Sequence, residues 1–126
     1  VCVLLDQHHR DGIVVDFFNR PAQTTPMMVQ LAMKTGAPVV PAFTLRTDDQ
    51  RYCTEFGEPL FFEPTGAAET IRQYTQHCND IIEAAVSRKP SQWFWLHNRW
   101  RPVPESSRQP DNSISTIERS LTASSR

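Results

Sequence analysis

The stretch TTPMMVQLAMKTGAP, residues 24–38, carries the clearest local signal in the sequence and predicts a helix. Thr25 is a candidate N-cap, and Pro26 suits the first helical position, where its missing N–H is not needed. Gly36 is typical of a helix stop, because glycine adopts the left-handed conformation without strain. The apolar run VVPAFTLR, residues 39–46, follows at once and predicts a strand.

Further apolar runs on either side of this unit complete the predicted fold. VCVLLD, residues 1–6, predicts a buried strand, and IVVDFF, residues 13–18, predicts a second strand or an extended loop. Residues 51–64 predict one or two more strands, and a long helix is expected from Thr65 to near Lys89. A strand, a helix and a strand in succession favour a right-handed crossover. We therefore predict an α/β fold with a mainly parallel sheet flanked by helices.

The composition favours one folded domain. The chain has 126 residues, of which 39% are hydrophobic and 21% are charged. Its formal net charge of -1 argues against binding nucleic acid through bulk charge. The three cysteines form no CxxC pair, which predicts reduced thiols. The sequence becomes polar and Ser-rich near its end, so we expect a domain over residues 1–102 and a disordered tail over residues 103–126.

A polar loop, DQHHR, follows the first predicted strand. Ligands of open α/β sheets bind beyond the carboxyl ends of strands, so this loop either contacts a ligand or is simply polar. His8 and His9 are adjacent, and adjacent side chains on an extended chain point to opposite sides. We therefore predict no metal site here.

Arg20 lies shortly before the hydroxyl-rich start of the predicted helix, Thr24 and Thr25. A guanidinium beside a helix N-terminus can bind an anion, especially a phosphate. The alternative is an ordinary helix cap with an exposed arginine.

The segment QWFWLHNRW gathers all three tryptophans of the chain, Trp93, Trp95 and Trp100. Tryptophan favours sites where part of its ring contacts apolar groups and part contacts water, such as a membrane interface. Arg99 and Arg101 would add attraction to anionic headgroups. Helical spacing would place Trp95 and Arg99 on one side of this segment. The alternative is that two of the three tryptophans cover the sheet as part of the core.

The order of several segments resembles the bacterial lipid A biosynthesis acyltransferases, the late (secondary) enzymes that act on Kdo-lipid A precursors. The segments are VLLDQ, DFFNRPAQTTP, LAMKTGAPVVPAF, CNDIIEAAV and KPSQWFWLHNRWR, and the resemblance spans residues 1 to about 102. Asn19 stands where the family usually has glycine, and asparagine tolerates a left-handed turn better than most residues.

This resemblance implies the C-terminal part of a glycerolipid-acyltransferase-like α/β fold, with no cofactor. It implies transfer of a fatty acyl chain from an acyl carrier protein thioester to a hydroxyl of a lipid A precursor. The implied location is the cytoplasmic face of the inner membrane. Acyl transfer to another acceptor, such as phosphatidylinositol mannoside or a glycerophospholipid, is an alternative, and so is a non-catalytic lipid-binding module.

The family's catalytic signature, H-x4-D/E, is absent from this sequence. The residues at the acidic position after the four histidines are Ile13, Val14, Ile82 and Pro102. GxSxG, GxGxxG and P-loop motifs are absent as well. The resemblance therefore implies that the catalytic histidine, a general base on the acceptor hydroxyl, lies upstream of Val1. We expect this chain alone to be an inactive fragment.

The resemblance also implies which residues meet the substrate. By this resemblance Asp6 and Gln7 lie near the active cleft, and Arg10, in the same polar loop, is a further candidate for substrate binding. The candidate anion site comprises Arg20, Thr24 and Thr25. The candidate membrane interface comprises Trp93, Trp95, Arg99, Trp100 and Arg101.

Overall fold

The structure is a computed structural model that describes residues 1–102. The tail predicted over residues 103–126 lies outside the described residues, so its disorder and the domain boundary stay predictions. In chain order the elements are β1 (Ile13–Phe17), β2 (Arg20–Thr24), α1 (Met27–Thr35), β3 (Ala42–Arg46), β4 (Tyr52–Phe56), α2 (Ala68–Arg88) and a short 3-10 turn (Pro90–Gln92).

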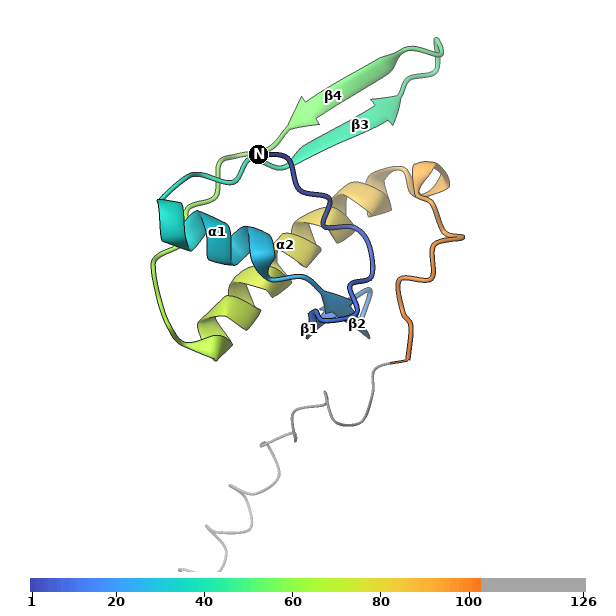
Figure 1. The fold of residues 1–126 in the computed structure, drawn as a ribbon. Coiled ribbons are helices and arrows are strands. Elements are labelled where there is room, and N and C mark those ends of the chain that lie inside the picture. Colours follow the sequence, from blue (N-terminus) through green and yellow to red (C-terminus); the bar gives the residue numbers. More distant parts are fainter. Residues whose placement is uncertain (103–126) are drawn as a thin grey trace, which may run out of the picture.

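The strands form two separate antiparallel hairpins, β1–β2 and β3–β4 (Figure 1). A mainly parallel sheet was expected, and this expectation is wrong for residues 1–102. Short connections such as the one between β1 and β2 join antiparallel strands, whereas parallel pairing needs a long crossover. The segment Val1–Asp6, expected as a strand, forms none: it pairs with no strand of residues 1–102. The α/β composition of the fold is confirmed.

A tight two-residue turn, Phe18 and Asn19, closes the first hairpin. Both residues are left-handed, with φ of 52° and 54°, as a primed hairpin turn requires. The expected left-handed turn at Asn19 is therefore confirmed. A left-handed phenylalanine is strained, and two contacts hold it: its N–H donates to Oε1 of Glu83 at 2.7 Å, and its ring meets that of Phe17 edge-on.

Helix α1 begins and ends close to the predicted positions. Pro26 is the N-cap residue and not the first helical residue, and Oγ1 of Thr25 accepts the N–H of Met27 at 3.3 Å. Gly36 ends the helix as predicted, with φ of 68° and its N–H bonded to the carbonyl of Ala32 at 2.8 Å.

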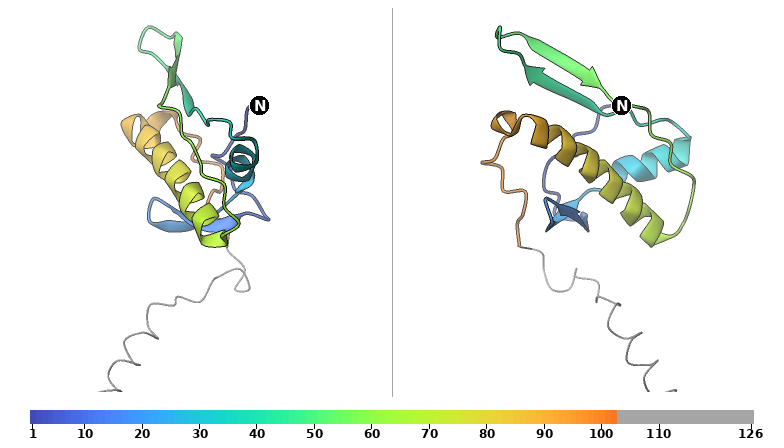
Figure 2. Two further views of the ribbon diagram at one scale, coloured as in Figure 1. Left: turned by 90° about the vertical axis from the view of Figure 1, so that its left-hand side faces the viewer. Right: turned by 180° about the vertical axis from the view of Figure 1, so that it is seen from behind.

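Helix α2 is the longest element, and its packing defines the core. It begins at Ala68, three residues later than expected, and ends at Arg88. Figure 2 shows α1 and α2 side by side, with the β1–β2 hairpin below them. The buried apolar cluster between these elements comprises Leu5, Phe17, Ala22, Val29, Ala32, Met33, Phe62, Cys78, Ile82 and Val86.

The β3–β4 hairpin projects away from this core (Figure 1). Tyr52 and Phe56 are 74% and 73% exposed on it. The hairpin is fixed to the body by Gln92, whose side-chain amide bonds the N–H and the carbonyl of Arg46, both at 2.8 Å. None of the helices described in residues 1–102 has the length and apolar character needed to cross a membrane.

Candidate functional site

Arg99 is the most enclosed charged side chain of the described chain, at 1% exposure. Its Nη1 donates to the carbonyl of Gln23 at 2.8 Å, and its Nη2 donates to Oγ1 of Thr24 and to Oδ1 of Asn79. Its guanidinium also lies 5.3 Å from the ring centre of Phe17. We expected Arg99 to face lipid headgroups; the structure instead encloses it, because three acceptors from β2 and α2 converge on it.

Asp6 supplies the negative charge that faces this buried cation. Burial lowers the pKa of Arg99, and the charge of Asp6 raises it. An arginine stays protonated at neutral pH even so. Oδ1 of Asp6 and Nε of Arg99 are both buried and have no hydrogen-bond partner among the described residues. The charge of Asp6, a residue predicted to bind substrate, thus acts on Arg99, a residue predicted to meet the membrane.

The loop after Asp6 lies against β2. The N–H of His9 donates to the carbonyl of Gln23 at 3.2 Å, and Nε2 of Gln23 donates to the carbonyl of Arg10 at 3.2 Å. Gln7 and Arg10 are exposed, so both side chains are free to meet a ligand.

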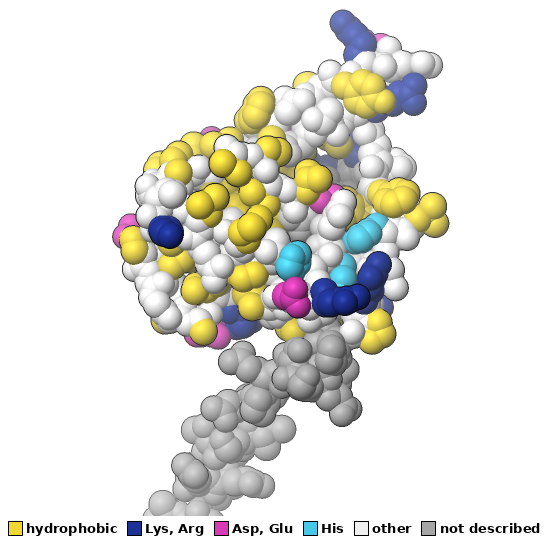
Figure 3. Space-filling view, viewed as in Figure 1, with side chains coloured by type: hydrophobic (Ala, Val, Ile, Leu, Met, Phe, Trp, Pro, Cys, Tyr) yellow, Lys and Arg dark blue, Asp and Glu magenta, His cyan; other side chains and the backbone are white. Residues whose placement is uncertain are grey.

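Two histidines connect this loop to the last described segment of the chain. The backbone N–H of His8 donates to Nε2 of His97 at 3.0 Å. An accepting Nε2 requires the neutral tautomer of His97 with its proton on Nδ1. The pKa of His8 is lowered by burial, then by the charges of Arg101 and Arg99. Figure 3 shows histidine and basic side chains side by side on this face, with an acidic side chain beside them.

Arg20, Thr24 and Thr25 do not converge as the predicted anion site required. Arg20 begins β2 and Thr24 ends it, and an extended strand of that length separates them by about 13 Å. The guanidinium of Arg20 lies over the ring of Trp100, 4.7 Å from its centre. Thr24 is fully buried with Arg99, and Oγ1 of Thr25 already accepts a backbone N–H.

The tryptophan segment is not helical beyond Pro90–Gln92, so the expected helical spacing is wrong there. The chain continues as turns and extended backbone. Three consecutive apolar side chains of this part are exposed, Phe94 at 67%, Trp95 at 49% and Leu96 at 88%.

The tryptophans themselves divide between core and surface. The rings of Trp93 and Trp100 pack on Phe17, with centroids 5.7 and 5.6 Å away, and Nε1 of Trp100 donates to the carbonyl of Phe17 at 2.9 Å. Trp95 lies outside them, stacked on Trp100 at 6.5 Å and facing Phe18 at 6.2 Å. Only Trp95 is thus largely available at the surface.

An apolar cavity of about 730 Å³ lies beside this polar cluster, within the usual size of ligand pockets. Its walls come from the N-terminal segment, both helices and β3, and include Val3, Leu31, Val40, Leu45, Ile81 and Trp93. Asp6 and Lys89 are the charged residues among those that line it. The arrangement suits a molecule with a long apolar part and a polar end.

The cysteines and histidines of residues 1–102 are not gathered into a cluster of metal ligands. No group of three His, Cys, Asp or Glu side chains there is close enough to hold a metal ion. Cys2 and Cys53 are free and exposed. Cys78 is buried, and burial raises its pKa to about 12, so its thiol is unreactive at neutral pH.

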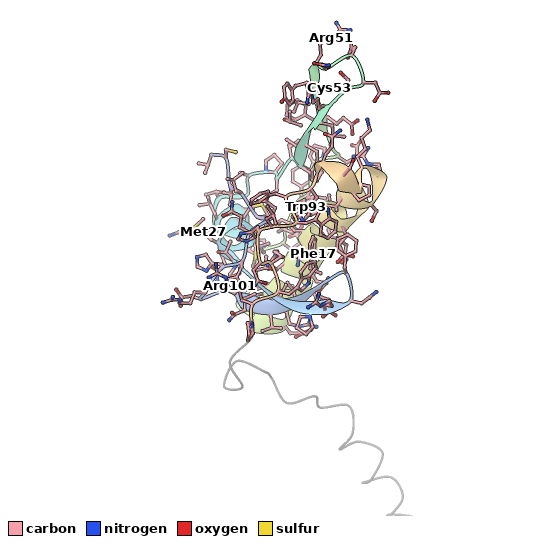
Figure 4. All side chains as sticks on the ribbon, turned by 90° about the vertical axis from the view of Figure 1, so that its right-hand side faces the viewer. Phe17, Met27, Arg51, Cys53, Trp93 and Arg101 are labelled. Atoms are coloured by element: carbon pink, nitrogen blue, oxygen red, sulfur yellow. The ribbon has the colours of Figure 1, made fainter. Side chains whose placement is uncertain are left out.

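Sequence reasoning missed that His8, His97 and Asn79 belong to the site. Each of their contacts joins positions far apart in the chain, 89 for the histidine pair and 20 for Arg99 with Asn79. A single sequence carries no local signal for such pairs. Figure 4 shows Phe17 and Trp93 in the body, with Arg51 and Cys53 far away on the hairpin.

Comparison with known proteins gives two matches. The family described as "Bacterial lipid A biosynthesis acyltransferase" matches residues 1–102. The "Lipid A biosynthesis lauroyltransferase" of Escherichia coli (strain K12) is 30% identical over 102 residues, which cover 79% of this chain and 32% of the relative. The chain thus spans about a third of the length of this curated relative.

Proposed function

Because the chain belongs to the bacterial lipid A biosynthesis acyltransferase family, we propose that the protein containing it transfers a fatty acyl chain to a hydroxyl of a lipid A precursor. The proposed donor is an acyl carrier protein thioester. The attacking hydroxyl loses its proton to a base, its oxygen forms the ester bond, and the carrier thiol leaves. The base is the histidine of an H-x4-D/E motif outside these 126 residues, so the chain alone is inactive.

The apolar cavity with Asp6 at its edge is the observation that supports this function best. An acyl thioester has a long hydrocarbon part and one polar, reactive end. In the proposed complex the hydrocarbon occupies the cavity, between Leu31, Ile81 and Trp93. The reacting groups then lie near Asp6, with Gln7 and Arg10 exposed beside it to contact the acceptor.

We further propose that the protein works at a membrane surface, the cytoplasmic face of the inner membrane. Phe94, Trp95 and Leu96 form a short exposed apolar segment, and Arg101 is exposed close after it. Such a combination inserts apolar side chains at the headgroup level while a cation meets anionic lipid. Trp100 packs against Trp95 of this segment, while Trp93 and Arg99 pack in the core beside Phe17.

The test uses a chimera in which residues 1–102 replace the matched 102 residues of the Escherichia coli lauroyltransferase. The purified chimera receives lauroyl-acyl carrier protein and three separate acceptors: a lipid A precursor, a glycerophospholipid and phosphatidylinositol mannoside. We expect transfer to the lipid A precursor alone. Preferred transfer to another acceptor would refute the proposed substrate, and a folded chimera that transfers to none would refute the activity.

A further inference from the structure

The β3–β4 hairpin has one strand, β4, whose outer edge carries backbone groups without partners. The N–H of Thr47 donates to the carbonyl of Arg51 at 2.8 Å, which fixes where hydrogen-bonded and non-hydrogen-bonded pairs alternate along the hairpin. Tyr52, Thr54 and Phe56 fall in the non-hydrogen-bonded pairs, so their N–H and C=O groups point away from β3. These groups form the outer edge of β4.

The body of the protein covers part of the β3 edge but leaves the β4 edge open. The side-chain amide of Gln92 accepts from the N–H of Arg46 and donates to its carbonyl, both at 2.8 Å, in the manner of a neighbouring strand. All five residues of β4 are exposed, and no other residue of the range 1–102 bonds the outward groups of β4. Figure 1 shows β4 as the strand farther from α2. An open edge of this kind is a template for a further strand.

The side chains of β4 offer little protection to this edge. Natural proteins block open edges with lysine, proline or a bulge, and the regular strand Tyr52–Phe56 has none of these. Tyr52 and Phe56 are 74% and 73% exposed and lie on the same face, because side chains alternate along a strand. Glu55 lies on the opposite face and pairs with Arg88 at 2.8 Å. The edge therefore presents two aromatic rings with no charged residue between them on that face.

The sequence of β4 is complementary to itself when two copies run antiparallel. With Thr54 of each copy opposite the other, Tyr52 of one copy stands opposite Phe56 of the second. All the outward N–H and C=O groups then fall in hydrogen-bonded pairs, and each ring faces an aromatic partner. The charges agree as well, because Arg51 of one copy lies diagonally opposite Glu55 of the other. Backbone, aromatic and charged groups thus favour the same register.

We propose that the outer edge of β4 binds a second copy of this chain, whose own β4 adds antiparallel about a two-fold axis at Thr54. The two hairpins form one four-stranded sheet in the order β3–β4–β4–β3, with equivalent contacts from both copies. A lone two-stranded hairpin is marginally stable, and the added strands stabilise it. The proposal does not rest on the proposed function, because no residue of β4 lines the apolar cavity.

The first test measures the mass of the full 126-residue chain by sedimentation equilibrium over a range of concentrations. We expect a monomer–dimer equilibrium. Two double variants lose the same two rings but differ in charge: Tyr52→Glu with Phe56→Lys places opposite charges across the proposed pairs, and Tyr52→Glu with Phe56→Glu places like charges there. The first variant should dimerise about tenfold more tightly than the second, because the symmetry forms each pair twice. Added salt should reduce this difference.

Hydrogen exchange of the backbone amides identifies the edge that is covered. The amides of Tyr52, Thr54 and Phe56 should exchange more slowly as the concentration of the chain rises, whereas that of Thr44, which points outward from β3, should not respond. Leu96→Glu removes an 88% exposed apolar side chain from a different surface and should leave the dimerisation constant unchanged. A chain that stays monomeric, equal dimerisation of the two double variants, or β4 amides that do not slow would overturn the proposal.

Discussion

The N–H of His8 and Nε2 of His97, 3.0 Å apart, connect the first loop of the chain to the last described segment. Below this pair, Arg99 bonds the carbonyl of Gln23 and the hydroxyl of Thr24. The two contacts together fix the WLHNRW segment against β2. Thr24, a predicted substrate residue, and Arg99, a predicted membrane residue, are therefore directly bonded in the interior.

Replacing Arg99 with Met should destabilise the fold strongly. The substitution leaves Oγ1 of Thr24, Oδ1 of Asn79 and the charge of Asp6 without their buried cation. Removing one partner of a buried charged network costs about 3–5 kcal/mol. Urea unfolding measures the loss. The exposed Arg101→Met is the matched control and should change the free energy of unfolding by less than about 0.5 kcal/mol. Equal effects of the two substitutions would show that Arg99 is not the structural cation.

Gly12 should not tolerate a side chain, for a steric reason. A Cβ placed there would lie 2.6 Å from the backbone oxygen of Thr24, and backbone cannot move aside as a flexible side chain does. We expect Gly12→Ala to lower the free energy of unfolding by about 1–3 kcal/mol. Gly66→Ala is the control, because its Cβ would meet nothing within 4 Å. Thermal unfolding that ranks the two substitutions the other way would contradict the close packing of the first loop on β2.

The pKa of His8 should lie below its ordinary value of 6.5, because burial and the charges of Arg101 and Arg99 disfavour its protonated form. Between the folded pKa and 6.5 the unfolded chain binds more protons than the folded one. The free energy of unfolding contributed by His8 therefore rises with pH through this window and falls on acidification. An NMR titration measures the pKa directly. Arg101→Ala should raise it, while a wild-type pKa at or above 6.5 would contradict the geometry.

The preference of the enzyme for acyl donors of a given length should depend on the volume of the apolar cavity. Leu31 lines it and is 40% exposed, so Leu31→Trp can fill the cavity without disrupting α1. In the chimera we expect this substitution to lower transfer from the lauroyl donor about tenfold more than transfer from a shorter acyl donor. Met27→Trp adds the same ring on α1 at a residue outside the cavity lining and should leave the chain-length profile unchanged. Identical chain-length profiles for the two variants would show that the acyl chain does not bind in this cavity.

Local signals in the sequence predicted the helices well. Gly36 ends α1 because of its left-handed conformation, and α2 ends just before Pro90. Both effects depend on a few neighbouring residues. The hairpin at Phe18 and Asn19 was harder to recognise, since it lacks the glycine that usually marks such a turn.

The pairing of strands and the site depended on distant contacts. Val39 pairs with Leu60 and β3 pairs with β4, which no periodicity of the apolar residues could show. Arg99 illustrates the same limit. Its place beside two tryptophans suggested a surface role, but its hydrogen-bond partners lie 75 and 76 residues away on β2. The helical spacing assumed for that segment placed its side chains wrongly for the same reason.

The most direct measurement is mass spectrometry of lipid A from Escherichia coli cells in which the chimera replaces the lauroyltransferase. If residues 1–102 provide the corresponding part of a lipid A acyltransferase, the lipid A keeps the laurate that this enzyme adds. Lipid A that lacks this laurate, in cells where the folded chimera accumulates to the level of the enzyme it replaces, would contradict the account.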